Sequence, residues 1–250
     1  MLLRELGAEV LQVNCNPDGF NINVDSAVLN KKILKEYAEK YKFDYCVAVD
    51  GDGDRLVLSD NTGTIFSGDD VLYTLAARNK ITGKKSSDRV IGTTMSNQGV
   101  VEALDKIGIG FIRTDVGDKY ISRELVRENL NVGAEPSGHI IQREFSESGD
   151  ANIALVQTIS ALQELDTTMA EIKSKINYKP LTLKNFAVKD THIIETANFN
   201  ETVQGLKDRF PSARISVRKS GTEPIIRVMA EAETDNDKNE ILNKIESLIP

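Results

Sequence analysis

The chain has 250 residues, of which 40% are hydrophobic and 28% charged, and it contains no tryptophan. This is a globular composition, and the length allows one large domain or two to three small ones. The net charge of −7 argues against nucleic acid or an anionic membrane as the main partner, and the sequence has neither a long apolar run nor a secretory signal. We therefore expect a cytoplasmic protein in which Cys15 and Cys46 are buried free thiols.

The first 66 residues predict a small α/β segment that begins abruptly. Residues 1–7 have the pattern of the last turns of a helix closed by Gly7, which favours a truncated domain whose first strand is missing. Ser26 is the expected cap of the next helix. In chain order, the expected elements are a helix end at 1–7, a strand to 13, a helix at 26–41, and strands at 43–49, 56–58 and 64–66.

Helices and strands then alternate as far as residue 176. The expected elements are a helix at 69–78 capped by Asp69, a strand at 89–93, a helix at 98–107, a strand at 110–113, a helix at 118–128, a strand at 131–134, and helices at 150–165 and 169–176. Such alternation is typical of βαβ units around a parallel sheet.

The pattern changes after Lys179-Pro180, where the proline interrupts regular structure. The expected elements are a strand at 183–188, a helix at 199–209, strands at 213–218 and 225–232, and an amphipathic C-terminal helix. They predict a small α+β domain with an antiparallel sheet. His192 is expected at a strand edge, in a structural role. The predicted domains are residues 1–65, 66–180 and 181–250.

The run Asp50-Gly51-Asp52-Gly53-Asp54-Arg55 follows the apolar strand at 43–49. Three carboxylates at alternate positions are costly unless a cation holds them together, and oxygen ligands favour a hard ion such as Mg²⁺ or Ca²⁺. An EF-hand is excluded, because Arg55 and Asn61 stand where it requires Gly and Glu. A metal site and a solvated acidic turn are the remaining interpretations.

A second candidate loop, Arg218-Lys219-Ser220-Gly221-Thr222-Glu223-Pro224, lies between two predicted strands and is followed by Arg227. Its hydroxyls, backbone N–H groups and arginines are suited to holding a phosphate, although a merely polar hairpin fits equally well. The sequence does not predict a P-loop, because Arg78 stands where Gly83-Lys84-Lys85-Ser86 would need an upstream glycine.

A third loop, Glu135-Pro136-Ser137-Gly138-His139, combines a carboxylate, a hydroxyl and a histidine after a predicted strand. Carboxylate and hydroxyl groups suit the binding of sugar hydroxyls, and histidine can carry protons near neutral pH. Structural roles for Glu135 and His139 are the alternative. Upstream, Lys119 could face an anion, whereas Asp118 could simply cap the helix.

Together, the three loops resemble the α-D-phosphohexomutase family over essentially the whole chain. The segments 17–23, 94–97 and 114–120 are most similar to its bacterial phosphoglucosamine mutase branch. The resemblance implies a mixed α/β fold: a partial domain 2 with a metal loop, a complete domain 3 with a sugar-binding loop, and a small α+β domain that binds phosphate. It also implies Mg²⁺ as cofactor, a hexose phosphate as substrate, and phosphoryl transfer through a phosphoserine.

The resemblance assigns a role to each matching residue. Asp50, Asp52 and Asp54 would be metal ligands, and Arg55 and His139 would be catalytic, with Arg55 facing the transferred phosphate. The implied substrate-binding residues are Glu135, Ser137, Lys119, Arg218, Ser220, Gly221, Thr222 and Arg227.

The family's Ser-His-Asn-Pro phosphoserine loop does not occur in these 250 residues. We therefore expect a C-terminal portion of a mutase that is inactive alone and needs its N-terminal half as a partner. Activity on mannose or glucose phosphates, a non-catalytic sugar-phosphate-binding fragment and an unrelated Mg²⁺ phosphatase are the alternatives, although a phosphatase leaves two of the loops unexplained. An unpaired strand edge also makes a homodimer conceivable.

Overall fold

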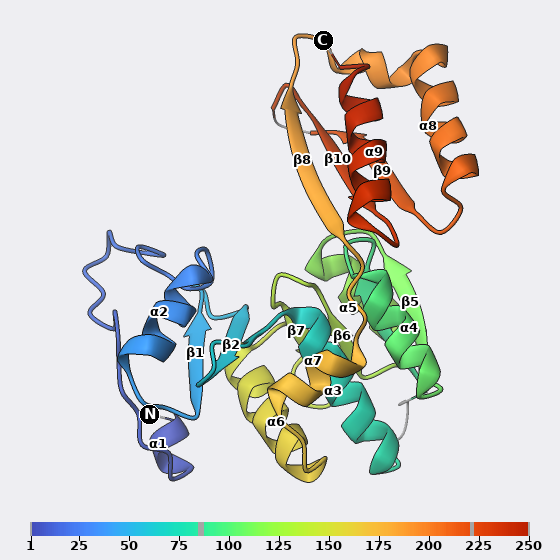
Figure 1. The fold of residues 1–250 in the computed structure, drawn as a ribbon. Helices are drawn as coiled ribbons and strands as arrows, with labels where there is room; N and C mark the ends of the chain where they lie inside the picture. The colour runs from blue at the N-terminus through green and yellow to red at the C-terminus, as the bar shows by residue number, and fades with distance from the viewer. Residues whose placement is uncertain (1, 85–87, 221–222, 250) are drawn as a thin grey trace. The chain divides into compact units, whose positions relative to one another are not determined.

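A computed structural model describes residues 2–84, 88–220 and 223–249 (Figure 1). The chain divides into two compact units: Met1–Ser96 with Val100–Ile176, and Asn97–Gly99 with Asn177–Pro250. The mixed α/β class is confirmed in both, whereas the division into three domains stays a prediction.

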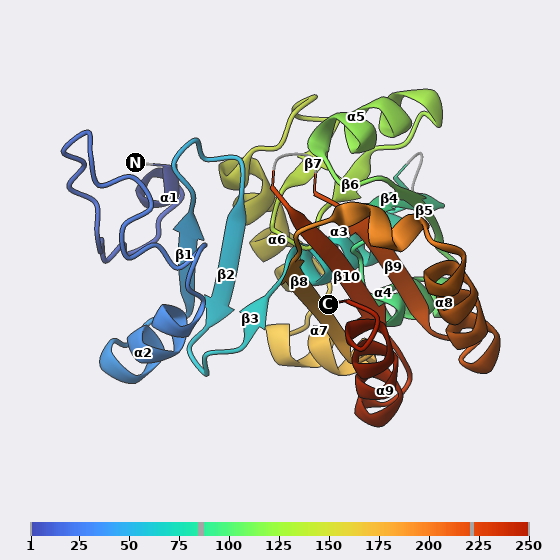
Figure 2. The same ribbon diagram turned by 90° about the horizontal axis from the view of Figure 1, so that it is seen from above.

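An antiparallel sheet of three strands opens the first unit (Figure 2). It consists of β1 (Tyr45–Val49), β2 (Leu56–Asp60) and β3 (Ile65–Phe66), in that spatial order. Val49 pairs with Leu56, so residues 50–55 form the connection between β1 and β2. The acidic run thus follows a strand, as predicted, but that strand belongs to an antiparallel hairpin.

Two predictions for the first 44 residues are wrong. Among the described residues no strand precedes β1, and Leu11 is 64% exposed, because β1 pairs with β2 and residues 8–13 meet no strand partner. The helix α2 (Lys32–Lys40) also begins later than Ser26. The side chains of Ser26 and Asn30 accept hydrogen bonds from backbone N–H groups two residues ahead, which competes with helix formation.

A second sheet carries the predicted βαβ pattern. Its strands are β4 (Arg89–Thr93), β5 (Gly110–Thr114), β6 (Val132–Ala134) and β7 (Ile140–Gln142), in the order β5-β4-β6-β7. The three strands β5, β4 and β6 are parallel, which confirms the prediction. The short β7 pairs antiparallel with β6 and was not predicted, since three residues are too few to show a period.

The remaining helices of the first unit match the sequence closely, apart from a short α1 (Leu2–Glu5). They are α3 (Gly68–Ile81), α4 (Gln98–Lys106, whose first two residues group with the second unit), α5 (Asp118–Arg127), α6 (Ala151–Glu164) and α7 (Met169–Lys175). The cap of α3 is Ser67, which forms a capping box with Asp70, so the prediction of Asp69 as cap is wrong.

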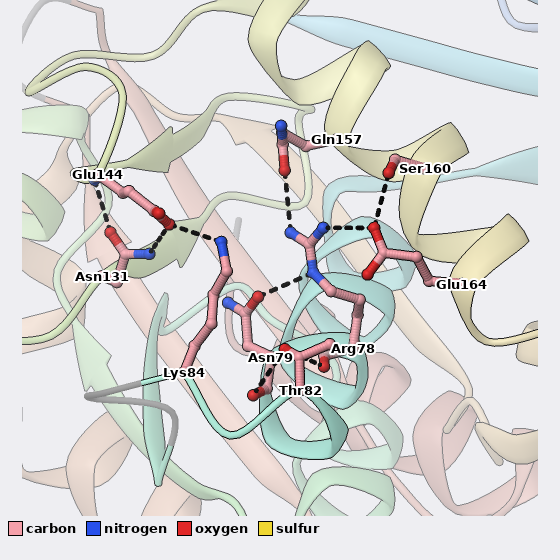
Figure 3. Close-up of polar contacts among 9 residues, drawn as sticks. All are labelled: Arg78, Asn79, Thr82, Lys84, Asn131, Glu144, Gln157, Ser160 and Glu164. Carbon is pink, nitrogen blue, oxygen red and sulfur yellow. Dashed lines mark hydrogen bonds and ion pairs between the residues drawn. The ribbon is translucent and has the colours of Figure 1, made fainter.

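A buried guanidinium joins α3 to α6 (Figure 3). Arg78 is 4% exposed, and it donates to Asn79 Oδ1 at 2.9 Å and to Gln157 Oε1 at 3.0 Å. Its third partner, Glu164, lies at 3.4 Å and also accepts from Ser160. These contacts satisfy the buried charge, so we assign Arg78 a structural role.

The second unit is the predicted antiparallel α+β domain. Its strands are β8 (Leu181–Ala187), β9 (Arg214–Lys219) and β10 (Ile225–Glu231), in the order β8-β10-β9, and its helices are α8 (Ala197–Arg209) and α9 (Asp235–Glu246). Both helices pack on the sheet over a core that includes Ile226, Val228 and Ile241. His192 lies in a 3₁₀ helix, η1 (Thr191–Glu195), so its expected strand-edge position is wrong; Asp190 caps this turn.

Residues 97–99 belong to the second unit through polar contacts. Asn97 accepts a hydrogen bond from the backbone N–H of Lys179 and donates to its carbonyl. The buried carboxylate of Glu231 accepts from the backbone N–H of Gln98 at 2.8 Å. A short segment from the middle of the chain therefore completes this unit.

Cys46 is half-buried, and burial raises the pKa of its thiol, but Cys15 is exposed, so the prediction of two buried thiols is wrong for Cys15. Within the part of the chain that the structure describes, no helix has the length and apolar character needed to cross a membrane.

Candidate functional site

The acidic loop, residues 50–55, brings three carboxylates together. One oxygen from each of Asp50, Asp52 and Asp54 lies within 4.8 Å of the others. The backbone N–H of Arg55 donates to Asp50 Oδ1 at 3.0 Å, which holds that side chain toward the loop. Gly53 has φ +74°, a left-handed conformation that suits glycine and lets the loop curl.

The negative charge of this loop is only partly compensated within the described residues. Arg55 Nε lies 3.6 Å from Asp50 and 3.7 Å from Asp54, and the Arg55 side chain is 46% exposed. Asp54 Oδ1 is buried without a hydrogen bond from the described part of the chain. Burial, followed by contact with Asp50, raises the pKa of Asp54, and His139 partly offsets this rise. These oxygen donors fit a hard divalent cation.

The hydroxyl loop, residues 135–139, is fastened directly to the acidic loop. Arg55 and His139 form an antiparallel β-bridge, and the N–H of Leu56 donates to the carbonyl of Gly138 at 2.9 Å. Gly138 has φ +102°, and a side chain there would overlap the backbone of Leu56. The fold therefore brings the predicted metal and sugar loops into one place, which the sequence could not show.

Glu135 connects this place to the start of α5. Its Oε1 accepts from the backbone N–H of Gly117 at 2.9 Å, and its Oε2 lies 3.4 Å from the hydroxyl of Ser137. Gly117 is the N-cap of α5 and makes no side-chain cap, so the predicted capping role of Asp118 is wrong. Lys119 is exposed, with its Nζ 4.9 Å from the centre of the Tyr120 ring.

The arginine pair, Arg218 and Arg227, lies in the second unit. The two residues are direct cross-strand partners on β9 and β10, and both are exposed. Like charges directly opposite each other are unfavourable, and among the described residues Arg227 has one ion-pair partner, the Glu223 carboxylate, at 3.9 Å. The N–H of Ser220 donates to the carbonyl of Ile225 and closes the hairpin. Gly221 and Thr222 lie outside the described residues.

Next to the arginine pair is a charged cluster that was not predicted. Lys219 Nζ donates to Glu195 Oε1 at 2.5 Å, and His192 Nδ1 lies 2.8 Å from Glu195 Oε2. The contacts with Lys219 and then His192 lower the pKa of Glu195 to about 2. No sequence signal connects these residues, because the contact depends on how η1 packs beside β9.

Two models of protein-family domains together match most of the chain. The model of phosphoglucomutase/phosphomannomutase alpha/beta/alpha domain III matches residues 67–178, and that of the phosphoglucomutase/phosphomannomutase C-terminal domain matches residues 167–248.

Curated bacterial relatives share one name, phosphoglucosamine mutase. The chain is 39% identical to the enzyme of Marinomonas sp., with 93% of this chain and 52% of the relative covered. It is 37% identical to that of Aeromonas hydrophila, with 98% and 55% covered. The chain thus spans about half the length of the curated relatives it matches.

Solved structures show the same fold at low identity. Aspergillus fumigatus N-acetylphosphoglucosamine mutase, in complex with GlcNAc-6P and magnesium, matches with a TM-score of 0.77 and 19% identity over 98% of this chain and 62% of the other. A phosphoglucomutase/phosphomannomutase family protein from Burkholderia thailandensis matches with a TM-score of 0.74 and 17% identity, over 99% and 56%. With the two domain models, the bacterial relatives and the fold in agreement, the chain belongs to the phosphoglucomutase/phosphomannomutase family, and it is similar to bacterial phosphoglucosamine mutases.

Proposed function

We propose that this chain provides the metal loop, the sugar-binding loop and the phosphate clamp of a phosphohexomutase that interconverts glucosamine 6-phosphate and glucosamine 1-phosphate. The observation that carries the proposal is the β-bridge between Arg55 and His139, which unites a three-carboxylate cluster with a loop suited to sugar hydroxyls. The names of the bacterial relatives favour glucosamine over mannose or glucose phosphates.

The acidic loop would hold Mg²⁺ through Asp50, Asp52 and Asp54. A bound Mg²⁺ supplies compensation for the negative charge of a phosphoryl group in transfer. Arg55 would add a guanidinium at the same place, because it already lies within ion-pair distance of Asp50 and Asp54 and almost half of its side chain is exposed. A guanidinium can bind two phosphate oxygens at once.

The hydroxyl loop would orient the sugar. Glu135 and Ser137 offer an acceptor and a donor to neighbouring hydroxyl groups, and the hydrogen bond from Gly117 fixes the Glu135 carboxylate. Lys119, exposed on the first turn of α5, would bind an anionic part of the substrate.

The second unit would hold the phosphate that is not transferred. Arg218 and Arg227 present two guanidinium groups on one face of the β9–β10 hairpin, and Ser220 adds a hydroxyl. We propose that Gly221 and Thr222 complete this clamp. An anion between the arginines would remove their mutual repulsion, which favours phosphate as the ligand.

The phosphoryl carrier must come from outside these 250 residues, because they contain no Ser-His-Asn-Pro loop. We propose that the chain alone binds hexose phosphate and Mg²⁺ without converting one sugar phosphate into the other. A segment that carries the phosphoserine would complete the site. A purely non-catalytic sugar-phosphate-binding role is the second candidate, which the lack of a Ser-His-Asn-Pro loop in these 250 residues also favours.

An assay of complementation separates the two candidates. The purified chain is tested for conversion of glucosamine 6-phosphate, alone and with the N-terminal half of the Aeromonas hydrophila relative, phosphorylated on its serine. The mutase proposal expects turnover only in the mixture, and none when that serine is replaced by alanine. Binding of glucosamine 6-phosphate without turnover in the mixture would instead support the non-catalytic role, and robust turnover by the chain alone would contradict the need for a carrier.

A further inference from the structure

A turn at residues 18–22 lies against the acidic loop. A side chain on Gly51 would overlap the side chain of Ile22, so Ile22 packs directly on the backbone between Asp50 and Asp52. Ile22 nevertheless remains 68% exposed. A partner that reaches the carboxylates from this side of the loop therefore contacts Ile22.

Hydrogen bonds fix the shape of this turn. Asp18 Oδ1 accepts from the backbone N–H groups of Phe20 and Asn21, both at 2.8 Å. The Asn21 side chain accepts from the N–H of Asp18 at 3.1 Å and donates to the carbonyl of Asn16 at 3.0 Å. Gly19 supplies a positive φ of +88°. The turn is thus held by its own polar contacts, and the Phe20 side chain is not needed to form it.

The Phe20 side chain is 91% exposed, the highest value among the large hydrophobic residues that the structure describes. Residues 6–31 form turns and irregular backbone, drawn in Figures 1 and 2 as the blue trace beside α2 and β1. This segment exposes five large apolar side chains: Leu11, Phe20, Ile22, Val24 and Leu29. Exposed apolar side chains that gather in this way indicate an interaction surface.

The position of this surface indicates what it binds. The acidic loop is already fastened to the hydroxyl loop by the bond from Leu56 to Gly138, and to the start of α6 by the bond from Ala151 to Gly53. A phosphoryl carrier has to approach the carboxylates past other segments, and the turn at 18–22 is one that borders the loop and exposes apolar groups. The relatives are about twice as long as this chain, so they have room for such a carrier.

We propose that Phe20 and Ile22 form the docking surface for the polypeptide segment that carries the phosphoserine, a partner with an apolar surface beside that serine. This inference rests on the proposed function, which places the phosphoryl carrier outside these 250 residues. Aromatic side chains are frequent anchors of protein interfaces, and a turn that is ordered in advance loses little freedom on binding. Docking beside Gly51 would bring the phosphoserine close to the proposed Mg²⁺ ligands.

Titration calorimetry tests the inference with the full 250-residue chain and the N-terminal half of the Aeromonas hydrophila relative, phosphorylated on its serine. The deciding variant is Phe20→Ala, because so exposed a side chain contributes little to the fold. We expect this variant to bind the N-terminal half at least about tenfold more weakly, as for the loss of an interface anchor, and to keep its Mg²⁺ affinity. Ile22→Ala should act in the same direction. Ile81→Ala, 75% exposed at the end of α3, is its matched control.

Turnover of glucosamine 6-phosphate by the mixture gives a second readout. In Phe20→Ala, the concentration of N-terminal half that gives half-maximal turnover should rise by the same factor. The maximal rate should stay unchanged, because the variant impairs docking and not phosphoryl transfer. A lower maximal rate with unchanged affinity for the N-terminal half would place Phe20 in the reaction itself and overturn the docking surface.

The other outcomes separate this inference from the proposed function. Unchanged affinity in Phe20→Ala overturns the docking surface, and turnover in that mixture leaves the mutase proposal standing. Binding that Phe20→Ala weakens, without turnover at saturation, supports the docking surface and contradicts the mutase proposal. No binding by the wild type overturns both. Sedimentation velocity of the chain alone tests another occupant: a dimer that Phe20→Ala dissociates would make a second copy the partner and overturn the inference.

Discussion

The acidic loop and the arginine pair both bring like charges together on a pair of antiparallel strands. They differ in how many contacts they make with neighbouring segments of the chain. The acidic loop joins β1 to β2 and is fastened to the hydroxyl loop through Gly138 and His139, and to the start of α6 through Ala151. Arg218 and Arg227 stand exposed on their hairpin, and the described part of that hairpin end is closed by the bond from Ser220 to Ile225.

The two sites therefore differ in how far their charged side chains are preorganised before a ligand binds. His139 holds the Asp54 carboxylate from outside the loop, and the N–H of Arg55 holds that of Asp50 from within it, so the fold meets part of the cost of gathering these charges. The arginine side chains are long and solvated, and an anion must order them at the moment of binding. We therefore expect changes in the acidic loop to have larger effects than changes in the arginine pair.

The largest effect is expected from Asp52→Asn and Asp54→Asn. Each removes a charged oxygen ligand, so the loss of Mg²⁺ affinity should exceed the roughly 10- to 100-fold typical of an outer-shell change. The melting temperature of the wild type should rise with MgCl₂, and that of either variant should not. Glu147→Gln, an exposed carboxylate outside the loop, serves as the control. A variant that still responds to MgCl₂ would place the cation elsewhere.

Gly138→Ala should break the fastening of the two loops. The residue has φ +102°, and the new Cβ would overlap the Leu56 carbonyl, so we expect a loss of about 2–4 kcal/mol in the free energy of unfolding. Urea denaturation measures this loss. Gly205→Ala on α8 is the matched control: nothing lies within 4 Å of its added Cβ, and it should be neutral or slightly stabilising. Equal effects of the two variants would show that Gly138 does not hold the loops together.

Arg218→Ala and Arg227→Ala should weaken binding of glucosamine 6-phosphate by about 1.5–3 kcal/mol each, the range for hydrogen bonds to charged groups. Without ligand, Arg218→Ala removes cross-strand repulsion, so stability should stay level or rise by about 0.2–1 kcal/mol. Arg227→Ala also removes the ion pair with Glu223, which offsets part of that gain. Titration calorimetry and thermal melting measure the two quantities. A variant that loses stability without losing affinity would make the arginines structural. Lys207→Ala, an exposed position on α8 outside the hairpin, controls for loss of charge.

The smallest effect is expected for Glu195→Gln, beside the arginine pair. Contact with Lys219 lowers the pKa of Glu195 to about 2, from 4.5 in the unfolded chain. A lowered carboxyl pKa contributes stability that is complete above pH 4.5 and is lost as the pH falls toward 2. The free energy of unfolding of the wild type should thus be slightly higher than that of the variant at neutral pH. This difference should shrink in acid and in high salt. A difference that grows below pH 4 would contradict this assignment.

The sequence predicted helices and strands well where apolar residues repeat with a clear period. It failed where contacts between distant segments determine whether an element forms. The parallel strands and the C-terminal sheet follow from apolar periodicity, whereas residues 8–13 show a strand pattern without a strand partner. The acidic loop was visible because its residues are adjacent. The contact of His139 with Asp54 spans 85 positions and depends on the packing of Gly149, so no local pattern could predict it.

The membership of Asn97–Gly99 in the second unit affects how the protein can be divided for study. A fragment that begins at Asn177 would include all of β8, β9 and β10, yet it would leave the buried Glu231 carboxylate without the N–H of Gln98 and the backbone of Lys179 without Asn97. An unmet buried acceptor is expensive. The second unit is therefore discontinuous in sequence, and a fragment that begins at Asn177 should have a lower free energy of unfolding than one that keeps these hydrogen bonds.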